Sequence, residues 1–113
     1  MSIQYKNAPF NLLTSNLTTA LTISTSAIAI VKSVYFSNTS TGSILCTGKI
    51  LDSSASSDHE FFRDEVAATT QINATPQGLN LEAGDAIKVQ ADTASKVEGL
   101  ISYALINREN ENG

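Results

Sequence analysis

Short runs of apolar residues, separated by clusters of turn-forming residues, recur along the chain and constrain its fold most. No long window places apolar side chains at the three-to-four-residue spacing of an amphipathic helix. Ser and Thr occupy 26 of the 113 positions and Asn nine more, and these residues are poor helix formers. Strand-length runs between turn clusters are typical of packed antiparallel sheets. The sequence therefore predicts an all-β protein, a single antiparallel β-sandwich of jelly-roll or Ig-like type.

Seven or eight strands are expected, and residues 27–37 form the strongest candidate. Their alternation predicts one face with Ile28, Ile30, Val34 and Phe36, interrupted by Lys32, and an opposite face with Val31 and Tyr35. Because both faces are partly apolar, we expect a central strand that is covered on two sides. The other expected strands cover residues 9–13, 17–24, 43–52, 59–66 (a strand or a short helix), a short piece through Leu79 and Leu81, 86–91 and 97–107.

One domain is expected, because 113 residues suffice for one core. We divide the chain into an N-terminal arm or edge strand (residues 1–16), the sandwich (17–107) and a polar C-terminal tail (108–113). The longest apolar run covers residues 27–31, too short for a membrane span, and no secretory leader is expected. The net charge of −4 disfavours nucleic acid, whose phosphates require a positive surface.

Charge is distributed unevenly along the chain. Residues 1–51 contain no acid, residues 52–113 contain all eleven, and 25 consecutive residues between Lys6 and Lys32 carry no charge. Either hydroxyl and amide groups keep this segment hydrated, or much of it contacts protein, since charged residues are depleted in interface cores. For Tyr5, Phe10, Leu12 and Leu13 we consider two roles, anchors onto a neighbouring subunit or ordinary core packing.

The sequence offers no catalytic constellation. His59 is the single histidine, and neighbouring Asp58 would point to the opposite face of a strand, so it could not orient the imidazole. Cys46 lies among apolar residues and is expected to be buried and inert. The carboxylates around residues 52–65 lack the spacing of a calcium loop. We therefore expect no enzyme, no metal and no cofactor.

Three segments together resemble small β-rich virion structural proteins of tailed bacteriophages. They are a strand ending in SNTS (residues 34–40), a strand and turn reading LEAGDAIKVQA (81–91) and a closing strand with SY (101–103). The resemblance covers roughly residues 30–106. It implies a structural turn, in which Gly84 permits the backbone conformation and Asp85 accepts hydrogen bonds.

The resemblance also implies a non-enzymatic role, with a capsid decoration (cement) protein as the leading hypothesis. Such a protein would self-associate as a homo-oligomer, with a trimer favoured, and would bind the major capsid protein. A neck or tail accessory protein of the same virion is the first alternative, with neck or tail proteins as partners. A receptor- or glycan-binding module is the second. The implied location is the virion, at the capsid surface ahead of the tail, after synthesis in the bacterial host cytoplasm.

Overall fold

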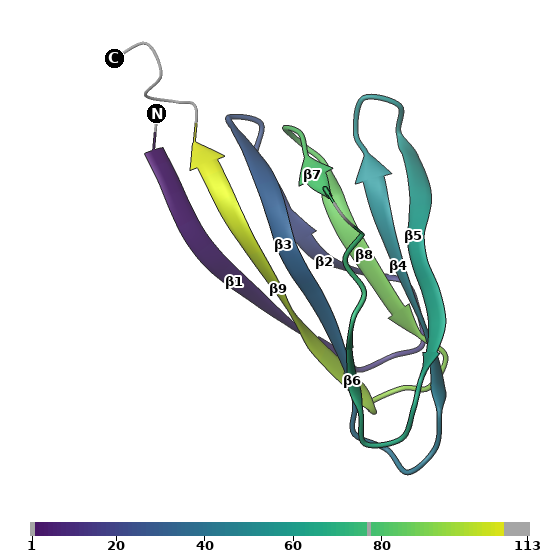
Figure 1. The fold of residues 1–113 in the computed structure, drawn as a ribbon. Helices are drawn as coiled ribbons and strands as arrows, with labels where there is room; N and C mark the ends of the chain where they lie inside the picture. The colour runs from purple at the N-terminus through teal and green to yellow at the C-terminus, as the bar shows by residue number, and fades with distance from the viewer. Residues whose placement is uncertain (1, 77, 108–113) are drawn as a thin grey trace.

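The computed structural model describes residues 2–76 and 78–107, which form two antiparallel β-sheets packed face to face (Figure 1). The all-β sandwich predicted from the sequence is confirmed, and the described residues contain no helix. The expected tail, residues 108–113, lies outside the described residues. The nine strands are β1 (Ser2–Leu12), β2 (Thr18–Thr22), β3 (Ala27–Asn38), β4 (Ile44–Asp52), β5 (Ser57–Val66), β6 (Gln71–Asn73), β7 (Asn80–Leu81), β8 (Ala86–Ala91) and β9 (Val97–Asn107).

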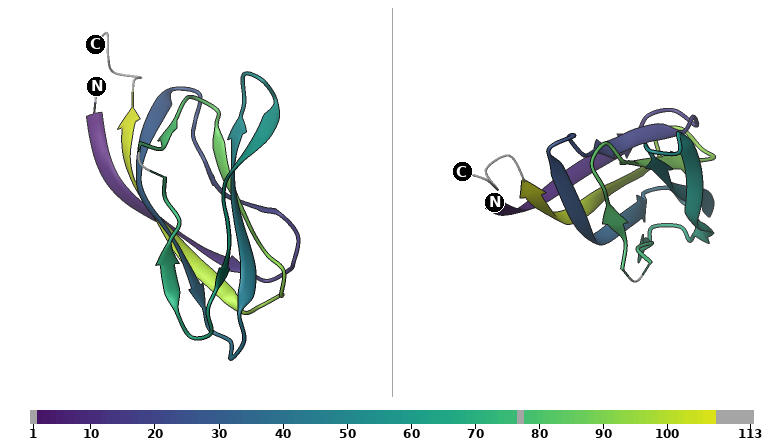
Figure 2. Two further views of the ribbon diagram at one scale, coloured as in Figure 1. Left: turned by 45° about the vertical axis from the view of Figure 1, so that its right-hand side comes forward. Right: turned by 90° about the horizontal axis from the view of Figure 1, so that it is seen from above.

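The order of the strands is that of a jelly roll. Sheet A has the order β1-β9-β3-β6, with β7 also paired to β3, and sheet B has the order β2-β8-β4-β5. Successive strands alternate between the sheets at most connections, as the two further views in Figure 2 show. Because β6 and β7 both lie beside β3, at different points along it, nine strands fill eight positions. The structure thus selects the jelly-roll alternative over the Ig-like one.

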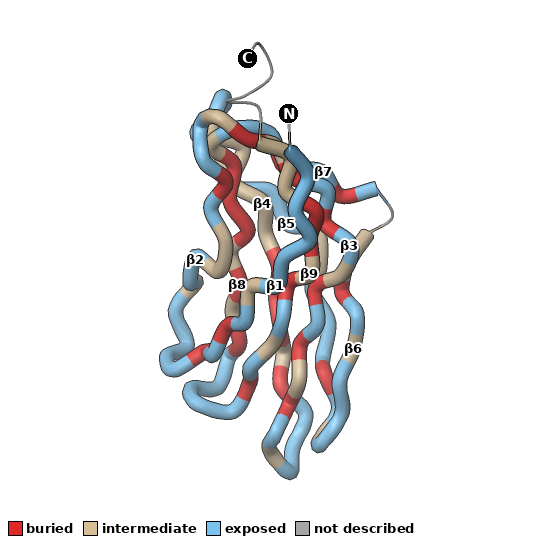
Figure 3. Tube along the Cα trace, turned by 90° about the vertical axis from the view of Figure 1, so that its left-hand side faces the viewer, coloured by how far each residue is buried: buried red, intermediate tan, exposed pale blue. Residues whose placement is uncertain are grey.

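Residues 2–12 form the edge strand β1, which pairs with β9 along its whole length, from Ser2 opposite Asn107 to Leu12 opposite Val97. The strand begins well before residue 9, where the sequence predicted it, because Ile3 and Tyr5 already occupy alternate, strand-favouring positions. All side chains of residues 2–7 are exposed, so neither face of this half of β1 is covered by another layer (Figure 3).

The alternation predicted for β3 is wrong in its first half. Ile28 and Ile30, expected on the face of Val34 and Phe36, point to the opposite face. A β-bulge inserts Lys32 as an extra residue in the pairing with β9, and this reverses the alternation within the strand. Strand periodicity alone does not mark such an insertion, because both halves of the strand alternate regularly.

Aromatic rings from both sheets meet in the core. The ring of Phe36 packs edge-to-face on Phe10 at a centroid distance of 5.6 Å and stacks on Phe62 at 5.5 Å. Gly99 leaves the space that this packing needs, since a Cβ there would lie 2.3 Å from the Phe10 ring and 2.0 Å from the Tyr35 carbonyl oxygen. The absence of a side chain at Gly99 therefore allows β1, β9 and β3 to approach closely around the rings.

Candidate functional site

The outer face of sheet A, which points away from sheet B, carries most of the exposed apolar side chains. The strand register arranges this face in rows across β1, β9 and β3. Three rows are mainly apolar and two are polar. They are Ile3/Ile106/Ile28, Tyr5/Ala104/Ile30, Asn7/Ser102/Ser33, Pro9/Leu100/Tyr35 and Asn11/Glu98/Ser37.

Six large hydrophobic side chains are exposed among the described residues, and five of them lie in these rows. Their exposed fractions are 76% for Tyr5, 55% for Ile3, 47% for Ile30, 40% for Tyr35 and 37% for Leu100, while Leu13, at 66%, follows β1. Single exposed apolar residues are normal on protein surfaces, but their concentration on one face is typical of an interaction surface.

The side chain of Lys32 extends over part of this face, to the ring of Tyr5. The ammonium group of Lys32 lies 5.1 Å from the centre of the Tyr5 ring, in cation–π geometry. β9 separates the two strands that carry these residues, and it contributes small side chains at this level, Ser102 and Ala104. Lys32 and Glu98 are the charged residues that the described pairing places on the outer face of sheet A.

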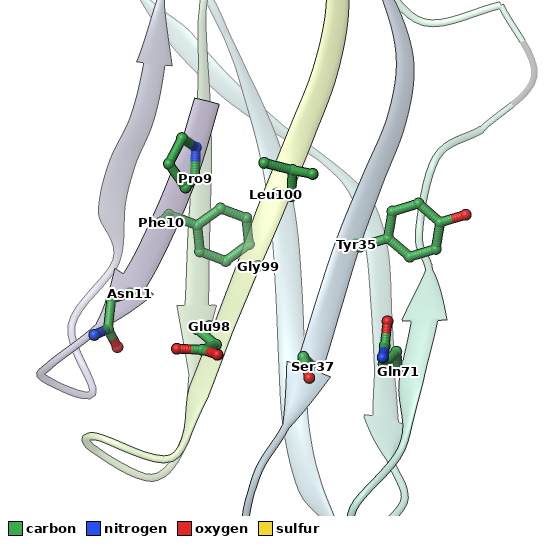
Figure 4. A pocket seen from close by; sticks show the side chains of 9 residues that line it. All are labelled: Pro9, Phe10, Asn11, Tyr35, Ser37, Gln71, Glu98, Gly99 and Leu100. Atoms are coloured by element: carbon green, nitrogen blue, oxygen red, sulfur yellow. The ribbon is translucent and has the colours of Figure 1, made fainter. Parts of the chain in front are cut away.

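A shallow groove of about 790 Å³ lies over the half of this face nearest the C-terminal end of β1 (Figure 4). Apolar groups come from β1 and β9, and Tyr35 stands on the other side with polar neighbours. The lining residues are Pro9, Phe10, Asn11, Tyr35, Ser37, Gln71, Glu98, Gly99 and Leu100. The groove thus offers the exposed ring of Tyr35 with hydroxyl, amide and carboxylate groups around it.

The outer face of sheet B has the opposite character. There the ammonium group of Lys88 pairs with Asp58 at 3.1 Å, and the guanidinium of Arg63 pairs with Glu60 at 2.8 Å. The hydrogen bonds from Arg63 hold the pKa of the Glu60 carboxyl below its usual value. A surface with paired charges is typical of a face that remains in water. The two faces of the sandwich therefore differ, with exposed apolar side chains on sheet A and paired charges on sheet B.

The four residues predicted as interface anchors divide into two pairs. Phe10 and Leu12 are buried, at 9% and 1% exposure, and pack in the core of this chain. Tyr5 and Leu13 are exposed. The division follows from the pairing with β9, which turns alternate residues of β1 toward sheet B.

Sequence reasoning missed four exposed residues of this face, namely Ile3, Ile30, Tyr35 and Leu100. For Ile30 and Tyr35, the apolar residues on both faces of the β3 segment carried the signal, but we expected another layer of this chain to cover the second face. Within the described residues no layer covers it, because sheet B packs on one side of sheet A only. The apolar residues on both faces of β3 therefore reflect one face buried against sheet B and one exposed apolar face.

The turn before β8 is a connecting point of the fold. Gly84 has a φ of +85°, which glycine adopts without strain. The buried carboxylate of Asp85 accepts hydrogen bonds from the Glu82 amide at 3.0 Å, the Ser53 amide at 3.0 Å and the Ser53 hydroxyl at 3.1 Å. The backbone of the turn also pairs with Ile23. The turn therefore joins the end of β2 to the β4–β5 connection.

The other titratable candidates do not gather into a site. His59 is exposed, and its Nε2 lies 3.0 Å from the Ser57 hydroxyl. Cys46 is fully buried; burial, and then the charge of Asp92, raises the pKa of its thiol to about 11. The described part of the chain holds no group of three or more His, Cys, Asp or Glu side chains that could bind a metal ion.

No helix long and apolar enough to span a membrane occurs in residues 2–76 and 78–107. No family model and no curated protein sequence matches the chain.

Solved structures share the fold at low sequence identity. A protein of the disulfide-linked pili that form Bacillus endospore appendages has 15% identity and a TM-score of 0.53, over 92% of this chain and 86% of that one. A chain of the IBDV viral particle, an icosahedral virus, has 7% identity and a TM-score of 0.54, over 91% of this chain and 30% of that one. PirA has 18% identity and a TM-score of 0.51, over 88% and 92%. These similarities show that the chain shares a sandwich fold with proteins of different kinds.

Proposed function

We propose that the chain is a non-enzymatic structural protein of a virion, a capsid decoration protein that docks through the outer face of sheet A. The observation that carries the proposal is the concentration of exposed Ile, Leu and Tyr side chains on that face, opposite a face with paired charges. A decoration protein adds buried area where shell subunits meet, and large apolar side chains dominate such contacts.

The uncharged N-terminal segment supports the same role, because β1 and β3 form much of the docking face and acids are absent before residue 52. The fold supports it more weakly. Sandwiches of this kind occur in a viral particle and in a pilus, both of which are assemblies of many subunits. Self-association belongs to the proposal as well, with a trimer as the form expected from the sequence.

Charge-introducing variants on the two faces test the docking surface. Leu100→Glu and Tyr35→Glu place an acid on the outer face of sheet A, while Thr19→Glu, the matched control, places one at an exposed position of sheet B. We expect the first two to reduce co-sedimentation with particles of the encoding virus at least tenfold, and the control to bind as the unmodified protein does. If Leu100→Glu binds unchanged, this face is not the docking surface.

The copy number in purified virions separates the proposal from the neck or tail alternative. Hundreds of copies per particle agree with a shell lattice, and tens or fewer agree with a ring or a tail attachment. Absence of the protein from purified virions would refute both. Deletion of residues 1–13 is unsuitable as a test, because it removes Phe10 and Leu12 from the core.

The residues that line the groove support a second candidate function, that of a glycan-binding module. Tyr35 projects beside Gln71 and Ser37, and an aromatic ring with nearby hydrogen-bonding groups suits a sugar ring (Figure 4). Titration with cell-wall oligosaccharides, followed by amide chemical shifts, tests it. Shifts confined to the groove and abolished by Tyr35→Ala would support a glycan site, and no shifts at millimolar sugar would exclude those sugars.

A further inference from the structure

The edges of the two sheets differ in how well they are protected against pairing with another chain. β2 is short and has a register shift, and β6 and β7 are shorter still. β5 is long, but it carries four acids and Arg63 along its length and a register shift opposite β4. Edge charges, bulges and short strands are the usual devices against edge-to-edge association. β1 is an eleven-residue edge with one charged side chain, Lys6.

The backbone of β1 presents its odd-numbered residues to the open edge. The carbonyl of Leu12 accepts from the Ser95 amide at 2.8 Å, on the β9 side of the strand. Successive residues in a strand point their amide groups to opposite sides, so the even-numbered residues face β9 and the odd-numbered ones face outward. Pro9, which has no N–H, falls in the outward set, where proline is tolerated in a strand. Ile3, Tyr5 and Asn7 therefore present N–H and C=O groups to the open edge.

We propose that this edge pairs antiparallel with the same edge of a second copy, about a twofold axis at Tyr5. Tyr5 then lies opposite Tyr5 of the partner subunit, and Ile3 lies opposite Asn7 of the partner subunit. Hydrogen-bonded pairs exchange two bonds each, which gives about six backbone hydrogen bonds across the axis. The two Tyr5 rings emerge on the same face, where cross-strand aromatic pairs are favourable. This contact gives a dimer in place of the trimer expected from the sequence.

Charge and proline favour this register over an axis at Lys6. An axis at Lys6 would place two like charges directly opposite each other and would bring Pro9 into the pairing. An axis at Tyr5 instead places Lys6 opposite Gln4 of the partner subunit, and the described strand then pairs over residues 2–8, which do not include Pro9. β1 contains no acid and one base, Lys6. The paired edges therefore add little charge repulsion of their own.

The pairing would join the outer faces of two A sheets into one continuous surface. The inference goes beyond the proposed docking function and stands without it, because it concerns the edge of the sheet and not its face. Leu100→Glu should reduce particle binding at least tenfold without changing the dimer, so a failure of one proposal is distinguishable from a failure of the other.

Proline substitution tests the backbone pairing. Tyr5→Pro removes an N–H that faces the open edge and spares the hydrogen bonds to β9, whereas Asn11→Pro, the matched control, removes an outward N–H beyond the paired segment. We expect light scattering and sedimentation equilibrium to show a dimer for the unmodified protein and Asn11→Pro, and a dissociation constant at least tenfold higher for Tyr5→Pro. A monomer at all concentrations of the unmodified protein, or an unchanged dimer in folded Tyr5→Pro, would overturn the proposal.

Single cysteines test the register even if the proline variant does not fold. Opposite Cα atoms of a hydrogen-bonded pair lie about 5.5 Å apart, within the range of a disulfide. Tyr5→Cys should therefore cross-link two copies under mild oxidation. Asn7→Cys should not, because the register separates the two Asn7 positions by about 14 Å along the strands. Cys46 is buried and does not compete. Equal cross-linking at both positions would contradict the proposed register.

Discussion

Alanine substitutions at three glycines provide a graded test of the packing between the strands. A Cβ at Gly99 would lie 2.0 Å from the Tyr35 carbonyl oxygen and 2.3 Å from the Phe10 ring, and real Cβ contacts stay beyond 3.0 Å. Backbone of β3 must therefore move by about 1 Å, and overpacking of this kind costs roughly 1–3 kcal/mol. Because the closest contact is backbone, we expect the upper end, about 3 kcal/mol, and a melting temperature about 13 °C lower.

The other two glycines give the comparison. A Cβ at Gly48 would lie 2.7 Å from the Phe61 ring, which is able to swing aside, so Gly48→Ala should cost about 1 kcal/mol. Apart from its chain neighbours, no described residue has an atom within 4 Å of the Cβ position at Gly42, and Gly42→Ala should stay within about 0.5 kcal/mol of the unmodified protein. Urea unfolding measures all three. If Gly99→Ala and Gly42→Ala have equal stability, the close approach of β3 and β9 described above is wrong.

Three further predictions follow from buried polar groups. Asp85→Ala removes the acceptor of three hydrogen bonds and should cost about 3 kcal/mol in urea unfolding, against about 1 kcal/mol for Ser53→Ala; equal losses would contradict the role of the carboxylate. Asn38→Ala should cost about 2 kcal/mol, because the Asn38 side-chain amide donates to the carbonyls of Gly42 and Val66 at 2.8 and 2.9 Å; a neutral result in thermal melts would refute this. Burial raises the pKa of Cys46 from 9.0 to about 11, so the folded state holds this proton more tightly than the unfolded state does. Its contribution should be complete below pH 9 and decline toward pH 11, and the stability difference from Cys46→Ala should shrink over that range.

The sequence predicted the fold class because each strand depends on local alternation and nearby turn residues. β8 and β9 have the predicted bounds, and β3 and β4 differ by one residue. The jelly-roll order could not be predicted, since pairing between β1 and β9 joins residues about a hundred positions apart and no local pattern encodes it. The first half of β1 was missed because its burial is low, and strand prediction depends largely on burial patterns.

The exposure of the candidate interface residues could be predicted only in part. Tyr5 and Leu13 are exposed as an anchor must be, whereas Phe10 and Leu12 could be assigned to the core only once the phase of β1 relative to β9 was known. Ile30 was placed on the wrong face because a bulge changes the phase of β3 without altering composition. Tyr35 was placed on the correct face, but local sequence does not show whether a face is covered by another layer.

The place of β9 between β1 and β3 has a consequence for how the chain folds. Sheet A is incomplete until β9, its last strand in chain order, inserts between β1 and β3. Both of these strands precede β9 by about sixty residues or more. Such distant pairing carries a large loop-closure entropy and gives slow folding, on the millisecond-to-second scale. Until β9 arrives, both flanking strands expose hydrogen-bonding edges to other chains. Nascent molecules of this protein should therefore depend on chaperones that shield strand edges, more than a helical chain of equal length would.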